Sequence, residues 1–116
     1  MKPATRTGLL APAGLLIGPA LWAAATQAGQ LLPYLSCGSP WRPAALATFP
    51  AALICLAAAW ASWRASRPDV LPDQQASAYP ASFAFIGRMS ALAGLVFAYA
   101  LALQGLSAMV LTGCER

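Results

Sequence analysis

Three cysteines, Cys37, Cys55 and Cys114, carry the side chains with the widest chemical range in this sequence of 116 residues. A thiol can act as a nucleophile, bind a metal ion or form a disulfide. The spacing of the three residues matches no zinc-binding pattern. The sequence also lacks histidine, the commonest metal ligand and general base in proteins. We therefore expect no metal centre, no cofactor and no catalytic site, so an enzyme is not the expected class.

Two amide side chains are candidates for a polar contact between helices. Gln27 lies ten residues before Cys37, and Gln104 lies ten residues before Cys114. If both cysteines end helices at the same membrane surface, the two amides share a depth and can hydrogen-bond to each other. The alternative is that one of them meets a partner subunit or lipid headgroups.

The composition places these residues in membrane-spanning elements. Hydrophobic residues make up 59% of the chain and charged residues only 9%, against about 25% charged residues in soluble domains. Three apolar runs are each long enough to cross a bilayer as a helix. We predict an all-α, integral membrane bundle of three transmembrane helices in one domain (residues 1–116). The spans cover about 9–35, 43–63 and 82–112, with a polar connector at 64–80.

The first span needs two further remarks. Its apolar run is longer than the core of a signal peptide, so we expect it to be retained rather than cleaved. It also contains Pro12 and Pro19. Because proline lacks an N–H group and crowds the preceding helical turn, we expect a bend near Pro19.

The basic residues predict the orientation of the spans. With the N-terminus in the cytoplasm, five of the seven basic residues lie on the cytoplasmic side, as the positive-inside rule requires. The connector at 64–80 is then cytoplasmic, and the C-terminus lies in the periplasm of a bacterial inner membrane. Cys37 and Cys114 fall together on the oxidising side, which predicts a disulfide between them; the alternative is two separate thiols. Cys55 lies within the membrane, where it behaves as a small apolar residue.

Arg88 is a charge placed a turn and a half inside the third span. One interpretation is that it extends to the inner membrane surface, toward Asp69 or Asp73. The other is that it contacts a partner protein or an anionic lipid headgroup.

Small residues four positions apart mark two candidate faces for helix packing. Gly14 and Gly18 form one face, and Gly94, Ala98 and Ala102 form the other. Small side chains let helix backbones approach closely in a membrane. We expect these faces to meet a helix of the same chain or of a partner subunit, and we favour the partner.

Short motifs near both ends carry a family resemblance. The segment Gly18–Trp22, followed by Gln27 and Cys37, and the ending Thr112–Cys114 resemble those of small bacterial membrane proteins that are often encoded beside cytochrome c oxidase and its assembly factors. The resemblance implies an accessory or assembly protein of a respiratory oxidase.

The charge pattern narrows the function classes. The spans carry no Asp, Glu, Lys or His at depth, whereas ion-coupled transporters usually need such a group. The basic residues flank apolar runs, so we expect no nucleic acid partner, and no small-molecule substrate is indicated. The leading hypothesis is a non-catalytic accessory subunit that packs against other membrane protein subunits in the lipid bilayer. The alternative is a self-assembling, holin-like pore former.

Overall fold

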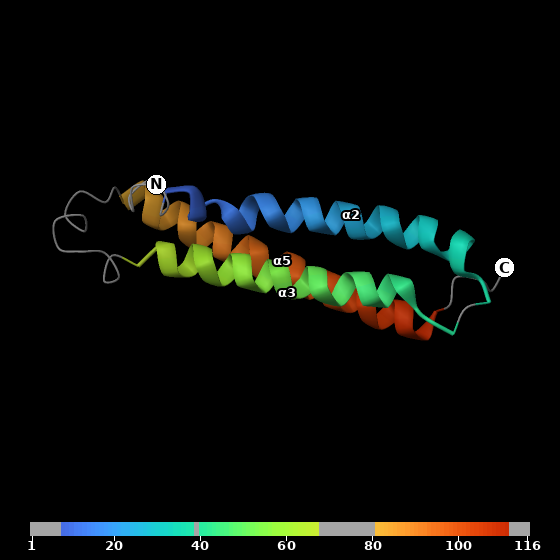
Figure 1. Cartoon of the computed structure of the whole chain (residues 1–116). Coiled ribbons are helices and arrows are strands. Elements are labelled where there is room, and N and C mark those ends of the chain that lie inside the picture. Colours follow the sequence, from blue (N-terminus) through green and yellow to red (C-terminus); the bar gives the residue numbers. More distant parts are fainter. Residues whose placement is uncertain (1–7, 39, 68–80, 112–116) are drawn as a thin grey trace.

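Three long helices account for most of the computed structural model, which describes residues 8–38, 40–67 and 81–111. They are α2 (Ala13–Ser36), α3 (Pro43–Ala65) and α5 (Ala81–Val110), and these residue ranges contain no strand. Each helix is long and apolar enough to cross a membrane. Figure 1 shows the helices side by side, with α3 antiparallel to both α2 and α5. The prediction of an all-α bundle with three membrane spans is therefore confirmed.

The first span differs from the prediction in where its helix is interrupted. A short helical turn at 8–10 is followed by a break at 11–12, and α2 begins at Ala13. Pro12 stands at the N-cap, and its carbonyl accepts hydrogen bonds from the N–H groups of Leu15 and Leu16, each at 3.1 Å. The helix then continues through Pro19 and Pro33. We expected a bend near Pro19, but the helix of the first span is interrupted at Pro12 instead.

Helices α3 and α5 pack along an antiparallel seam of small residues. A Cβ added at Gly94 would lie 2.9 Å from the Ala59 Cβ, so only glycine permits this approach. The buried positions recur at steps of three and four residues, a spacing that keeps one helix face toward its neighbour along a long contact. The seam consists of Ala45, Thr48, Ala52, Cys55, Ala59, Ser62 and Ser66 on one side and Gly87, Ala91, Gly94, Ala98, Leu101 and Gly105 on the other.

Most bulky apolar side chains point away from the bundle axis. Among the residues that the structure describes, Leu101 is the largest fully buried side chain, and most leucines, together with all four tryptophans, are exposed. Lipid is as apolar as leucine, so membrane helices gain little by burying large side chains and associate instead through close contacts between small ones. The seam and the outward side chains together identify a multi-pass membrane protein.

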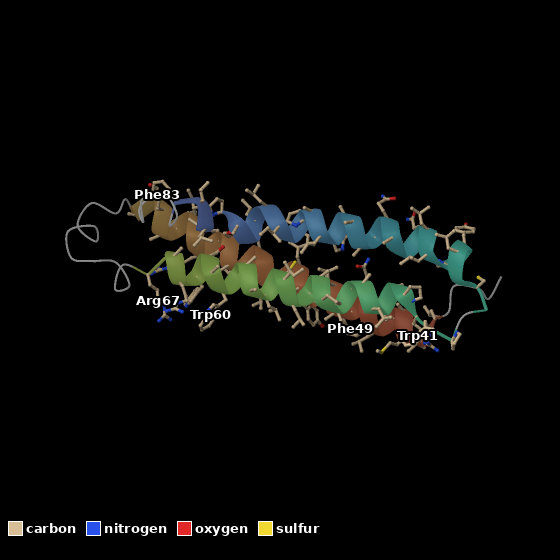
Figure 2. The ribbon with its side chains drawn as sticks, viewed as in Figure 1. Trp41, Phe49, Trp60, Arg67 and Phe83 are labelled. Atoms are coloured by element: carbon tan, nitrogen blue, oxygen red, sulfur yellow. The ribbon has the colours of Figure 1, made fainter. Side chains whose placement is uncertain are left out.

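Aromatic residues mark both ends of the bundle. Figure 2 shows Trp41 at the end where α2 stops and α3 starts, and Trp60 and Arg67 toward the opposite end. The Arg67 guanidinium lies 5.4 Å from the centre of the Trp63 ring, within range for a cation–π contact. Tryptophan is enriched at membrane–water interfaces, so the positions of these residues agree with one membrane surface at each end of the bundle.

Candidate functional site

Two buried serines join all three helices at the start of α2. The Ser62 hydroxyl oxygen of α3 accepts a hydrogen bond from the Gly14 N–H at 3.1 Å, and the Ser90 hydroxyl oxygen of α5 accepts one from the Leu15 N–H at 2.9 Å. The Ser62 hydroxyl donates to the Leu10 carbonyl at 3.1 Å. Both serine side chains are fully buried. We call these five residues the serine junction.

The serine junction pairs two backbone groups that the break at Pro12 leaves open, the Gly14 N–H and the Leu10 carbonyl. It also gives the Leu15 N–H a second acceptor beside the Pro12 carbonyl. The first N–H groups of a helix lack partners within it, and unpaired backbone groups are costly in a membrane. Because the single hydrogen of Ser62 goes to Leu10, Ser90 is the donor in the contact of 3.3 Å between the two hydroxyls. The other two helices therefore cap α2, which makes the junction a structural element rather than a reactive one.

The predicted small-residue faces are used within the chain. A Cβ at Gly14 would overlap the Ser90 carbonyl oxygen, and a Cβ at Gly18 would lie 2.8 Å from the Phe97 ring. Gly94 lies against Ala59, as part of the seam. Ala98 is 3% exposed and Ala102 is half-buried. Helices of the same chain therefore cover Gly14, Gly18, Gly94 and Ala98, which is the alternative that we did not favour.

The expected contact between Gln27 and Gln104 is also wrong. The Gln104 amide nitrogen donates to the Thr26 hydroxyl oxygen at 3.1 Å, and Gln27 is exposed on the outer side of α2. Neighbouring helical residues point about 100° apart. The depth of the contact was therefore predicted well, but the rotation of α2 brings the preceding side chain to Gln104.

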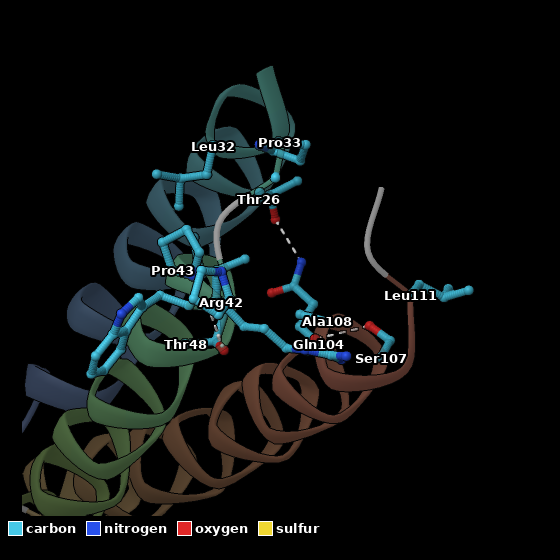
Figure 3. Close-up of a pocket in the computed structure, with 16 residues that line it drawn as sticks. Thr26, Leu32, Pro33, Arg42, Pro43, Thr48, Gln104, Ser107, Ala108 and Leu111 are labelled. Atoms are coloured by element: carbon cyan, nitrogen blue, oxygen red, sulfur yellow. Dashed lines mark hydrogen bonds between the residues drawn. The ribbon is translucent and has the colours of Figure 1, made fainter. Parts of the chain in front are cut away.

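A pocket opens where α2 ends, between α2 and the other two helices. It has a volume of about 630 Å³ and is lined by residues of α2, the 38–43 loop, α3 and the end of α5. Figure 3 shows Thr26, Thr48 and Gln104 around it, with the Gln104 side chain projecting from α5. The side-chain carbonyl oxygen of Gln104 is buried and has no hydrogen-bond partner among the residues that the structure describes. Arg42 is the charged residue of the lining.

The outer face of α2 carries a second stripe at steps of three and four residues, which we call the α2 stripe. Its members are exposed, unlike those of the seam between α3 and α5. No described residue hydrogen-bonds to the amide of Gln27 or Gln30 in this stripe. The stripe consists of Leu16, Ala20, Ala23, Gln27, Gln30 and Tyr34.

The remaining predicted site residues lie at the ends of the bundle. Arg88 is exposed near the start of α5, and Asp69 and Asp73, its predicted partners, lie outside the described residues. The Cys37 sulfur lies 2.9 Å from the Pro33 carbonyl oxygen. Cys114 also lies outside the described residues, so the Cys37–Cys114 disulfide stays a prediction.

Within the membrane, Cys55 is a free thiol with no exposed surface, in the core of the bundle. In the part of the chain that the structure describes, no group of three or more His, Cys, Asp or Glu residues could hold a metal ion.

Sequence reasoning missed the role of Ser62 and the pocket around Gln104. The signal for Ser62 was available, because it follows Cys55 and Ala59 at the same steps of four and three along α3. The pocket left no such signal, because its lining comes from four separate segments. Searches against protein-family models, curated proteins and solved structures find no match to this chain.

Proposed function

We propose that the protein is a non-catalytic accessory or assembly subunit of a larger membrane complex, and that it docks through the α2 stripe. The family resemblance of its terminal motifs favours a respiratory oxidase as that complex. The distribution of basic residues favours the bacterial inner membrane, with the N-terminus in the cytoplasm and the C-terminus in the periplasm.

The observation that carries this proposal is the pair of exposed amides at Gln27 and Gln30. Gln27 precedes the end of α2 by nine residues, and its neighbour Thr26 bonds to Gln104, six residues before the end of α5. The Gln27 amide therefore lies about 9–14 Å inside the helix ends, within a bilayer core about 30 Å thick. An amide facing lipid there has its donors and acceptor unpaired, which is unfavourable. A partner helix with a polar side chain at the same depth would satisfy both amides.

The shape of the α2 stripe supports the same partner. Ala20 and Ala23 are small and exposed, and they lie in line with the two glutamines. A helix can approach α2 closely along the alanines while its polar side chain reaches the amides. We therefore take the occupant to be a membrane-spanning helix of another subunit that carries a hydroxyl, amide or carboxyl group at the depth of these amides.

Replacing both amides tests this docking mode. The double variant Gln27→Leu/Gln30→Leu removes two interhelical hydrogen bonds of about 0.6 kcal/mol each, so affinity for the complex should fall roughly tenfold. The measurement is the amount of each partner subunit recovered per tagged chain from the native membrane in mild detergent. Recovery of partner subunits at the wild-type level would contradict the docking mode.

A matched pair of alanine substitutions separates the stripe from the rest of the surface. Ala23→Leu adds bulk in the middle of the stripe and should reduce recovery of the partner subunits. Ala47→Leu makes the same change at an exposed position of α3 and should leave recovery unchanged. If the tagged chain is instead recovered only with copies of itself and its expression makes membranes leak, the pore-forming alternative replaces this proposal.

A further inference from the structure

The pocket beside Gln104 combines an acceptor-rich inner wall with a cation. The Thr26 hydroxyl donates to the Trp22 carbonyl at 2.8 Å, the Thr48 hydroxyl to the Ala44 carbonyl at 3.0 Å and the Ser107 hydroxyl to the Gln104 carbonyl at 2.9 Å. Each hydroxyl has one hydrogen, so these three groups have only acceptor capacity left for a ligand. The lining therefore suits a ligand that brings hydrogen-bond donors of its own.

The clearest need for a donor is at Gln104. Its amide nitrogen already bonds to Thr26, while its side-chain carbonyl oxygen is buried without a partner in the described part of the chain. A buried acceptor without a hydrogen bond is unfavourable by about 1–3 kcal/mol. A ligand hydroxyl placed in the pocket would satisfy this oxygen.

Charge restricts the ligand further. Arg42 lines the pocket at the start of α3, and no carboxylate is among the lining residues that the structure describes. Figure 3 shows its side chain extending from α3 toward α5. An uncompensated guanidinium favours an anion, above all a phosphate, and disfavours a ligand ammonium group. The pocket lies near the end of a membrane-spanning bundle, where lipid headgroups supply such phosphates.

We propose that this pocket binds the headgroup of a phosphatidylglycerol-type lipid, with the phosphate at Arg42 and a headgroup hydroxyl at the side-chain carbonyl oxygen of Gln104. Phosphatidic acid has the phosphate but no headgroup hydroxyl, and phosphatidylethanolamine brings a cation near Arg42. The proposal does not depend on docking through the α2 stripe, which lies on the other side of α2.

Lipid binding to the purified full-length chain tests the proposal. The protein in mild detergent is titrated with phosphatidylglycerol, phosphatidic acid and phosphatidylethanolamine of matched acyl chains, and bound lipids are counted by native mass spectrometry. One phosphatidylglycerol should bind about fivefold more tightly than either other lipid, as expected for one satisfied hydrogen bond. Equal affinity for all three lipids would overturn the proposal.

Variants assign the two contacts separately. Arg42→Ala should weaken binding of phosphatidylglycerol and phosphatidic acid alike by about tenfold, since both lose a charge-assisted hydrogen bond. Gln104→Met should weaken phosphatidylglycerol alone, to the level of phosphatidic acid. The matched control is Arg64→Ala, which removes an exposed arginine from the last turn of α3 at the opposite end of the bundle and should change nothing. Unchanged binding to Arg42→Ala, or an equal loss with Arg64→Ala, would refute the site.

Two controls keep the result interpretable. Arg42 is exposed, so its replacement leaves the helix contacts in place. Arg42→Lys, which keeps the charge, should retain most of the binding and excludes misfolding as the cause of a loss. Soluble glycerol 3-phosphate offers the same headgroup without acyl chains and should not displace the lipid; displacement by it would show a site for the soluble anion and overturn the lipid assignment.

Discussion

Replacing Ser62 by alanine should destabilise the whole bundle, although Ser62 lies on α3 and the change removes a single oxygen. The Ser62 hydroxyl makes three contacts: it accepts from the Gly14 N–H, donates to the Leu10 carbonyl and accepts from the Ser90 hydroxyl. In the Ser62→Ala variant, the start of α2 loses one of its two caps. The Leu10 carbonyl, which the break at Pro12 leaves without a partner in the helix, also loses its hydrogen-bond donor.

The size of the effect follows from the number of bonds. Hydrogen bonds between membrane helices contribute about 0.6 kcal/mol each on average and up to about 1.7 kcal/mol. Three bonds of average strength give a loss of about 2 kcal/mol in the free energy of unfolding. The Ser62 side chain has no exposed surface and Gly14 is buried, so water cannot replace the partner that the Gly14 N–H loses.

Reversible unfolding in mixed micelles measures this loss. The purified chain is titrated with a denaturing detergent in a mild one, and helix content is followed by circular dichroism. Ser107→Ala is the matched control, because the Ser107 hydroxyl is exposed and bonds only to the Gln104 carbonyl of its own helix. We expect the control to change the free energy of unfolding by less than about 0.5 kcal/mol. If Ser62→Ala were no more destabilising than Ser107→Ala, the three-helix role of the serine junction would be refuted.

Two further predictions concern the seam and the ends of the helices. Gly94→Ala should destabilise the bundle by about 1–3 kcal/mol, because the added Cβ would lie 2.9 Å from the Ala59 Cβ. Gly29→Ala is the control and should not destabilise the bundle, because the space around Gly29 is open. Equal unfolding midpoints for the two variants would contradict the close approach of α3 and α5. If Cys37 and Cys114 form a disulfide, reduction should raise the mass of the wild-type chain by two units and leave the mass of a Cys114→Ser variant unchanged. The same gain in the Cys114→Ser variant would rule the pairing out.

The number and position of the spans could be predicted from the sequence because they depend on local properties. Length and hydropathy alone decide whether a run can cross the bilayer, so α3 and α5 begin within one residue of the predicted starts, Pro43 and Ser82. The exact site of a helix interruption depends on other helices. Pro12 can interrupt the helix because Ser62 and Ser90 cap the restarted one, whereas α2 continues through Pro19.

Partners across helices were harder to predict because they depend on helix rotation. Gln104 was expected to bond to Gln27 and bonds instead to Thr26, one residue earlier. The small-residue faces were identified correctly as packing surfaces, but the covering surface was assigned to a partner. Ala59 and Ser62 lie three residues apart on one face of α3, and Ala59 of this face contacts Gly94. Recognising this face would have indicated that Gly94 packs against a helix of the same chain.

The most direct test of the central claim is the composition of the assembly in the native membrane. The tagged protein is purified in mild detergent, and its co-purifying subunits are identified by mass spectrometry while an absorption spectrum is recorded. An accessory subunit should be recovered in a fixed ratio with respiratory oxidase subunits and their haem bands, and the Gln27→Leu/Gln30→Leu variant should recover less of both. Recovery of the wild-type chain alone, as a colourless homo-oligomer, would contradict the claim.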